Sequence, residues 1–229
     1  SGTETVELDS DIRDESAAGH GDHEVGAAAV VIPGIVDEES GAGIYSANLG
    51  WRDVPFRSLL AERLGLEIAL AHDVRSAGLA EFEFAEAMPD DAMMVTIGTG
   101  VAAAIRAEGR LISAGGYAGE IGFTEVAVDT ADGLFRGPVE HIASAAAIAK
   151  RYAARSGTSV AGSLDVLDAV HADDPVAREV FAEAVDALGA VCAQLVAVIA
   201  PEVIVFGGGL SGADELIRGV GTAMRRRLD

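Results

Sequence analysis

Three short apolar runs in the chain end at residues that could take part in phosphoryl transfer. The runs lead into three polar or glycine-rich segments: His72-Asp73, Gly98-Thr99-Gly100 and Gly207-Gly208-Gly209. A carboxylate such as Asp73 can take the proton of a substrate hydroxyl. Glycine turns let backbone N–H groups approach phosphate oxygens closely. Each signal also has a plain structural alternative, because Asp73 could cap a helix and the glycines could close ordinary turns.

These segments need elements that hold them. Apolar runs bounded by turn residues predict strands over 27–32, 68–71, 93–97 and 203–206. Helical spacing predicts helices over 56–64, 74–84, 139–154, 164–170, 175–200 and 216–228. The segments 101–106 and 110–112 predict a hairpin around Glu108-Gly109. Strands that alternate with helices are typical of an α/β fold with largely parallel pairing, in which ligands bind beyond the carboxyl ends of the strands.

Composition limits the possible partners. The 229 residues include 16 basic and 37 acidic side chains, for a net charge of −21, which argues against nucleic acid and anionic membranes. Half of the residues are hydrophobic, enough to bury a full core. The apolar run Ala187 to Ala200 is shorter than the ~20 residues of a membrane span. No signal peptide opens the chain, so we expect a cytoplasmic protein.

Two further features have ordinary interpretations beside a chemical one. Cys192 is the only cysteine, so no internal disulfide can form, and its apolar surroundings indicate a buried, inert thiol. His20 and His23 lie near acidic residues and could bind a metal, although a solvated tail or loop over 1–25 is the simpler interpretation.

Six motifs recur in the order and spacing of the ROK family, which the chain resembles over about residues 26–229. They are VIPGIVD at 31–37, SANLGW at 46–51, HD at 72–73 with AE at 80–81, IGTGV at 97–101, AGEIG at 118–122 and PEVIVFGGGLS at 201–211. That family comprises bacterial sugar kinases, including glucokinases, and related sugar-responsive repressors. The resemblance implies an α/β, actin-like (ribonuclease H-like), two-lobed ATPase fold, here apparently truncated at both ends. It divides the chain into an acidic tail over 1–25, the remainder of a smaller lobe over 26–72 and a larger lobe over 73–229.

The resemblance also implies roles for individual residues. Asp73 matches the catalytic base. Carboxylates suit polyhydroxylated substrates, and glycine loops suit phosphates. The residues implied to bind the sugar are Gly34, His72, Asp73, Glu120 and Glu140. The residues implied to bind ATP with Mg²⁺ are Gly98, Thr99 and Gly100 near the phosphates and Gly207, Gly208 and Gly209 near the adenosine. The substrate expected is a hexose such as glucose or an N-acetyl amino sugar, and the expected assembly is a homodimer.

The chain also departs from the family pattern. An Asp-x-Gly-Gly-Thr phosphate loop is absent, so we expect the chain as given to have little or no kinase activity. His72 replaces the asparagine that usually precedes the base, and Phe123 replaces a histidine. The segment 129–140 has no cysteine where the family has a zinc motif, so we expect no zinc. Three hypotheses remain: an active ATP-dependent hexose kinase, a sugar-binding pseudokinase or regulator, and a non-catalytic remnant that assembles with another chain.

Overall fold

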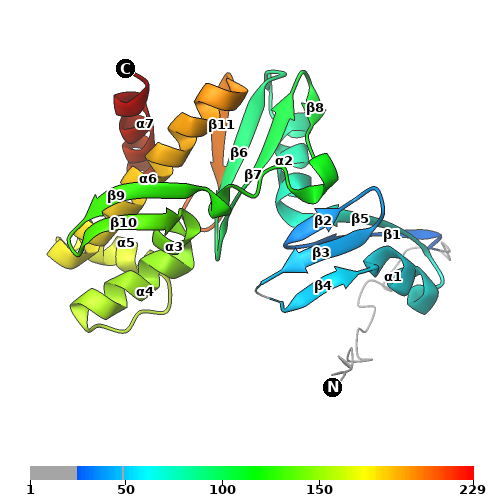
Figure 1. Cartoon of the computed structure of the whole chain (residues 1–229), viewed down its shortest axis with the longest axis horizontal. Coiled ribbons are helices and arrows are strands. Elements are labelled where there is room, and N and C mark those ends of the chain that lie inside the picture. The colour runs from blue at the N-terminus through cyan, green and yellow to red at the C-terminus, as the bar shows by residue number, and fades with distance from the viewer. Residues whose placement is uncertain (1–24, 48) are drawn as a thin grey trace, which may run out of the picture.

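The computed structural model describes residues 25–47 and 49–229 (Figure 1). The acidic segment with His20 and His23 lies outside the described residues, except for its last residue. Figure 1 shows β1 to β5 with α1 at one end of the molecule and β9, β10 and α3 to α7 at the other, with α2 and the sheet of β11, β6, β7 and β8 between them. The predicted lobe boundary between residues 72 and 73 stays a prediction.

The N-terminal part contains two small sheets and one helix. Its elements are β1 (Ala27–Ile32), β2 (Ile35–Asp37), β3 (Ala42–Ser46), β4 (Trp51–Val54), α1 (Phe56–Leu64) and β5 (Glu67–His72). β1 pairs with β5 in parallel, whereas β2, β3 and β4 form an antiparallel sheet. Helix α1 ends where predicted, because Gly65 takes the left-handed conformation (φ 67°) that closes a helix.

The remainder of the chain contains a four-stranded sheet, a hairpin and six α-helices. Its sheet has the order β11 (Val203–Gly207), β6 (Ala92–Ile97), β7 (Val101–Ala107), β8 (Arg110–Leu111). The hairpin joins β9 (Glu125–Thr130) and β10 (Gly133–Pro138). The helices are α2 (Asp73–Phe84), α3 (Glu140–Ala143), α4 (Ala145–Ser156), α5 (Ser163–His171), α6 (Pro175–Ile199) and α7 (Asp214–Leu228). Two short 3₁₀ turns, η1 (Ala114–Gly116) and η2 (Ile121–Phe123), lie between β8 and β9.

The prediction of largely parallel pairing is wrong. Only β1–β5 and β6–β11 pair in parallel among the described strands, and every other pair is antiparallel. Five strands were not predicted, namely β2, β3, β4, β9 and β10. They carry polar residues such as Asp37 and Arg52, and tight turns join them to antiparallel neighbours, so they lack the continuous apolar run of a buried parallel strand. The predicted hairpin around Glu108-Gly109 is confirmed.

The core of the larger part forms around α6. This helix is long and apolar enough to cross a membrane by length and composition, but half of its apolar stretch is buried inside the protein. It packs against α4, α5, α7 and β9, as a core helix does. Cys192 lies on its buried face, and burial raises the pKa of the thiol to about 12. The expectation of a buried thiol is therefore confirmed, and its inertness stays a prediction.

The predicted single helix over 139–154 is two helices, α3 and α4. The break is at Ser144, whose backbone is extended (φ −69°, ψ 155°) and whose hydroxyl accepts a hydrogen bond from the Ala147 N–H. A serine in this position is a strong N-cap, and it starts a new helix inside an otherwise helical pattern. The break matters for function because the Ala145 N–H donates to the Gly98 carbonyl at 2.8 Å. The start of α4 therefore lies against the glycine segment after β6.

Candidate active site

A cleft of about 1020 Å³ is lined by both parts of the molecule. Most of the candidate residues lie on its wall: Gly34, His72, Asp73, Gly98, Thr99, Gly100, Glu120 and Glu140. Gly34 can occupy its position because it has no side chain. Its φ is 104°, and a Cβ there would be 2.5 Å from the Tyr45 carbonyl oxygen. The structure thus brings together the acidic residues and the first glycine loop, which lie far apart in the sequence.

His72 ends β5 and caps α2, and only 3% of it is exposed. Its Nδ1 accepts a hydrogen bond of 3.2 Å from the Arg75 backbone N–H, so this nitrogen carries no proton. Burial and the nearby Arg75 charge lower the pKa of His72, while Asp73 and Glu38 raise it less. The neutral ring therefore carries its proton on Nε2. This atom lies 3.3 Å from Asp73 Oδ1 and 3.6 Å from Glu120 Oε1.

Asp73 is the first residue of α2, where the helix dipole favours a negative charge. The alternative interpretation of Asp73 as the helix cap is wrong, because the His72 side chain holds that position. The Asp73 carboxylate accepts one hydrogen bond from the Val74 N–H at 2.8 Å, and 44% of the side chain is exposed. It therefore keeps oxygen lone pairs that a hydroxyl in the cleft can reach.

Glu120 lies between η1 and η2, and 17% of its side chain is exposed. Its Oε1 is buried and has no hydrogen-bond partner among the described residues. Burial raises the pKa of Glu120, as do the neighbouring Asp73 and Glu140 carboxylates, against an opposite effect of Arg75. A buried acceptor without a donor costs about 1–3 kcal/mol. A ligand that donates a hydroxyl to this oxygen would recover that cost.

The Gly98–Gly100 segment forms a tight turn beside the start of α4. Its Gly98 N–H donates to the Gly100 carbonyl at 3.0 Å. A Cβ on Gly100 would lie 3.2 Å from Glu140 Oε2, so the turn and this carboxylate are neighbours. The dipole of a helix favours an anion at its first turn. Two N–H groups at the start of α4 are already bonded within the protein, Ala145 to the Gly98 carbonyl and Ala147 to the Ser144 hydroxyl, so the dipole of α4 and the glycine turn are what this end of the cleft offers a phosphate group.

The second glycine segment is separate from the carboxylates. Gly207 ends β11, where it pairs with Thr96 of β6, and Gly208 and Gly209 follow it. Gly208 has φ 90°, and a Cβ there would lie 2.3 Å from the Ile97 carbonyl oxygen. The segment therefore packs behind the strand that leads to Gly98. It does not line the described cleft.

The family of the chain is settled by comparison with known proteins. The family model described as ROK family matches residues 15–229. The chain belongs to the ROK family. This confirms the resemblance carried by the six motifs. Solved ROK structures share the actin-like, two-lobed α/β fold, which is the fold of this chain.

Relatives with different activities match this ROK chain. It is 31% identical to a glucokinase of Halalkalibacterium halodurans over 204 residues, which are 81% of this chain and 62% of that protein. It is 30% identical to an N-acetylglucosamine repressor of Escherichia coli O6:H1, over 83% of this chain and 50% of that protein. A ROK glucokinase from Streptomyces griseus, solved with glucose and AMPPNP, superposes with a TM-score of 0.76 and 27% identity. That superposition covers 90% of this chain and 73% of that one. The chain thus spans less than two thirds of the length of these two curated relatives.

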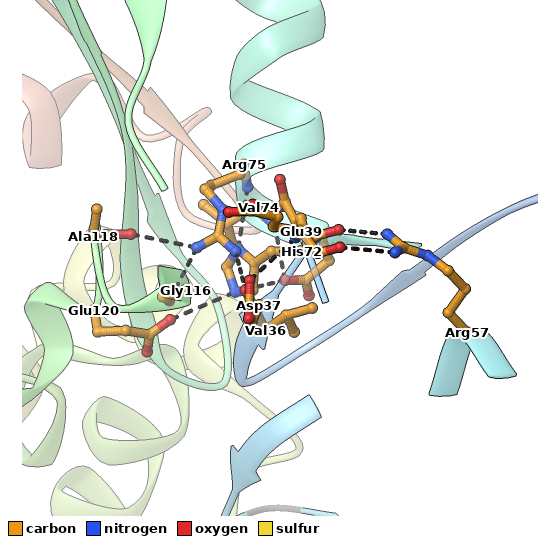
Figure 2. A network of polar contacts seen from close by, with 12 residues as sticks. Val36, Asp37, Glu39, Arg57, His72, Val74, Arg75, Gly116, Ala118 and Glu120 are labelled. Atoms are coloured by element: carbon orange, nitrogen blue, oxygen red, sulfur yellow. Dashed lines mark hydrogen bonds and ion pairs between the residues drawn. The ribbon is translucent and has the colours of Figure 1, made fainter. Parts of the chain in front are cut away.

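One polar residue that organises the site was not singled out in the sequence. Arg75 lies one turn after His72 (Figure 2), and only 1% of it is exposed. Its guanidinium forms an ion pair with Glu38, a residue of the turn after β2. In a sequence, an isolated arginine on a predicted helix indicates a surface residue. The one signal for a role in the site was that Arg75 lies three residues after His72, on the same face of the helix. Lys150 and Arg151 of α4 also line the cleft and were not predicted.

The prediction that the chain binds no zinc stays a prediction. Within 25–47 and 49–229, no group of three or more His, Cys, Asp or Glu side chains could hold a metal ion. Phe123, which stands where the family has a histidine, is half exposed on the cleft wall.

Proposed function

We propose that this ROK chain belongs to an ATP-dependent kinase of a hexose such as glucose or of an N-acetyl amino sugar. The observation that carries the proposal is the arrangement of Asp73, Glu120 and the His72 Nε2–H between them. Two carboxylates around a neutral imidazole offer several acceptors and one donor, which suits a sugar ring with many hydroxyls. The relatives named as glucokinase and N-acetylglucosamine repressor support the two sugar classes.

Asp73 acts as the general base in this proposal. It takes the proton from the sugar hydroxyl while that oxygen forms its bond to the terminal phosphorus and the bond to the leaving ADP breaks. The neutral His72 places its Nε2–H 3.3 Å from Asp73 Oδ1, where it offers a polar neighbour without removing the charge of Asp73. Glu120 and Glu140 accept hydrogen bonds from other hydroxyls and orient the ring.

The phosphates of the nucleotide would lie at the turn Gly98–Gly100 and the start of α4. ATP with Mg²⁺ supplies the phosphoryl group when bound. Within the chain, the dipole of α4 and the nearby Lys150 would offset the negative phosphate charge, whereas the neighbouring Arg151 is already paired with Glu183. Gly207 to Gly209, behind the same strand, remain the proposed neighbours of the adenosine. The predicted cytoplasmic location stays a prediction. The predicted homodimer stays a prediction.

Release of ADP in the presence of a sugar tests the proposal. We expect little ADP release from the 229 residues alone. Once an upstream Asp-x-Gly-Gly-Thr segment is added, we expect ADP release that depends on a hexose or N-acetyl amino sugar and that Asp73→Asn reduces at least 100-fold, in line with the usual contribution of a general base. Glu125→Gln is a matched control, because Glu125 is an exposed carboxylate at the start of β9, outside the cleft. Sugar-dependent release that Asp73→Asn leaves unchanged would contradict the assigned base.

A sugar-binding regulator without catalysis is the second candidate. One observation favours it: a repressor is among the relatives. In that case the chain binds the sugar through Glu120 and Asp73 but releases no ADP. The same assay, run beside calorimetry with the sugar alone, separates the two functions.

A further inference from the structure

Arg75 joins three segments that are distant in the sequence (Figure 2). From α2, its Nη2 donates to the Val36 carbonyl at 2.7 Å and its Nε to Glu38 Oε1 at 2.9 Å. Its Nη1 donates to the Gly116 carbonyl at 3.1 Å and, at 3.5 Å, faces the Ala118 carbonyl. One guanidinium thus connects the end of β2, the start of α2 and the segment that leads to Glu120.

Glu38 completes this connection. Its Oε1 accepts a second hydrogen bond, of 3.0 Å, from the His72 backbone N–H, so one oxygen binds both His72 and Arg75. The peptide carbonyls of Glu38 and Glu39 are in turn bonded by Arg57 of α1. The turn after β2 is therefore fixed from both sides.

The backbone of the segment before Glu120 lies so close to β2 that only glycine fits at position 116. Gly116 has φ 92°, and a Cβ there would lie 2.4 Å from the Val36 carbonyl oxygen. That same carbonyl accepts from Arg75. Because a buried charge is costly unless it is paired and fully hydrogen-bonded, the Arg75 contacts must be maintained together. The planar, five-donor guanidinium can span them, whereas a lysine ammonium cannot.

We infer that Arg75 is a positioning residue of the proposed sugar site, because it holds the segment Gly116–Glu120 at a fixed distance from Asp73. The inference rests on the proposed function, since the two carboxylates that it positions are the proposed sugar ligands. Its charge has a second effect at the same place. Arg75 lies close enough to lower the pKa of both His72 and Glu120, and so favours a neutral ring beside an ionised carboxylate.

Two substitutions separate the effect of the Arg75 hydrogen bonds from the effect of its positive charge. Arg75→Met removes both, and Arg75→Lys keeps the charge but loses the fork of donors. Hydrogen–deuterium exchange of residues 116–121 reports the geometry. Histidine NMR reports the charge through the pKa of His72, which is faced by Asp73, Arg75, Glu38 and Glu120. Arg106→Met is the matched control, because Arg106 is largely buried and donates to the Phe82 carbonyl at the other end of α2.

We expect exchange over 116–121 to rise at least tenfold in both Arg75 variants and to stay unchanged in Arg106→Met. The pKa of His72 should rise in Arg75→Met and return towards the wild-type value in Arg75→Lys. Calorimetry with glucose and N-acetylglucosamine should show at least tenfold weaker binding in both Arg75 variants. Wild-type exchange over 116–121 in Arg75→Met or Arg75→Lys would overturn the inference.

A milder variant covers the case in which Arg75→Met does not fold. Glu38→Gln keeps an acceptor oxygen and removes the charge of a partly exposed residue. It should raise exchange over 116–121 at least threefold, and an unchanged rate would again overturn the inference. The exchange and NMR readouts need no sugar. If the wild-type chain binds neither sugar, the proposed function fails while these two readouts still decide the role of Arg75.

Discussion

Replacing Glu120 by glutamine should stabilise the free protein and weaken sugar binding at the same time. The Oε1 atom of Glu120 is buried without a donor, and the side chain faces the carboxylates of Asp73 and Glu140. Glutamine keeps the shape, removes the buried charge and adds an amide donor that can bond a neighbouring carboxylate. A substitution that raises folding stability but lowers ligand affinity is typical of a residue whose unfavourable environment in the free protein serves binding.

The size of each effect follows from hydrogen-bond energetics. A hydrogen bond to a charged group contributes about 1.5–3 kcal/mol and a neutral one about 0.5–1.5 kcal/mol. Glu120→Gln therefore loses about 1–1.5 kcal/mol for each sugar hydroxyl that it binds, which is about five- to twelvefold in Kd. A stability gain of about 1 kcal/mol would raise the melting temperature by about 2–4 °C in a chain of this size.

Calorimetry with glucose and N-acetylglucosamine and a thermal melt measure the two effects, with Glu125→Gln as the control. Because the pKa of Glu120 is raised, wild-type affinity should fall with decreasing pH before an ordinary glutamate, with pKa 4.5, is protonated. The Glu120→Gln variant should lack this fall. A variant that binds the sugar as tightly as wild type, or that melts at a lower temperature, would refute the reasoning.

Two further predictions concern the framework of the site. Gly119→Ala should destabilise the chain by at least about 2 kcal/mol, since Gly119 has φ 93° and a Cβ there would lie 1.9 Å from the Ala103 carbonyl oxygen. Urea unfolding measures this, with Gly162→Ala as the control because a Cβ there meets nothing within 4 Å. Equal free energies of unfolding for the two variants would mean that the backbone around Gly119 can shift without cost. The second prediction is that His72 makes the free energy of unfolding depend on pH. The pKa of His72 in the folded chain lies below the ordinary 6.5, so as the pH falls the unfolded chain binds this proton before the folded chain does. The stability contributed by neutral His72 is complete above pH 6.5 and is lost as the pH falls from there towards the folded pKa. Urea unfolding between pH 7.5 and 5.5 should show a shallower slope in His72→Asn, and an identical slope would mean that His72 is not the group responsible.

The sequence was most informative where one segment carries its own signal. The apolar runs that become β5, β6 and β11 end at Asp73, Gly98 and Gly207, and their bounds agree with the predictions to within one residue. Glycine at the end of α1 also acts locally.

Features that depend on distant partners could not be predicted from the residues alone. The antiparallel pairing of β2, β3 and β4 depends on the turns that join them, and the break at Ser144 depends on a cap and on the Gly98 carbonyl. The role of Arg75 depends on carbonyls at positions 36 and 116, which no pattern in the sequence connects. The roles of Glu120 and Glu140 came from the family resemblance, not from periodicity.

Histidine NMR of the ¹⁵N-labelled chain during titration with glucose or N-acetylglucosamine tests the sugar site most directly. The Nε2–H of His72 lies between the two proposed sugar ligands, whereas His171, at the end of α5, is outside the described cleft and serves as an internal control. We expect at least one of these sugars to shift the His72 ring signals in a saturable way and to leave those of His171 unchanged. Unmoved His72 signals with both sugars at saturating concentration would contradict the assignment of a sugar to this cleft.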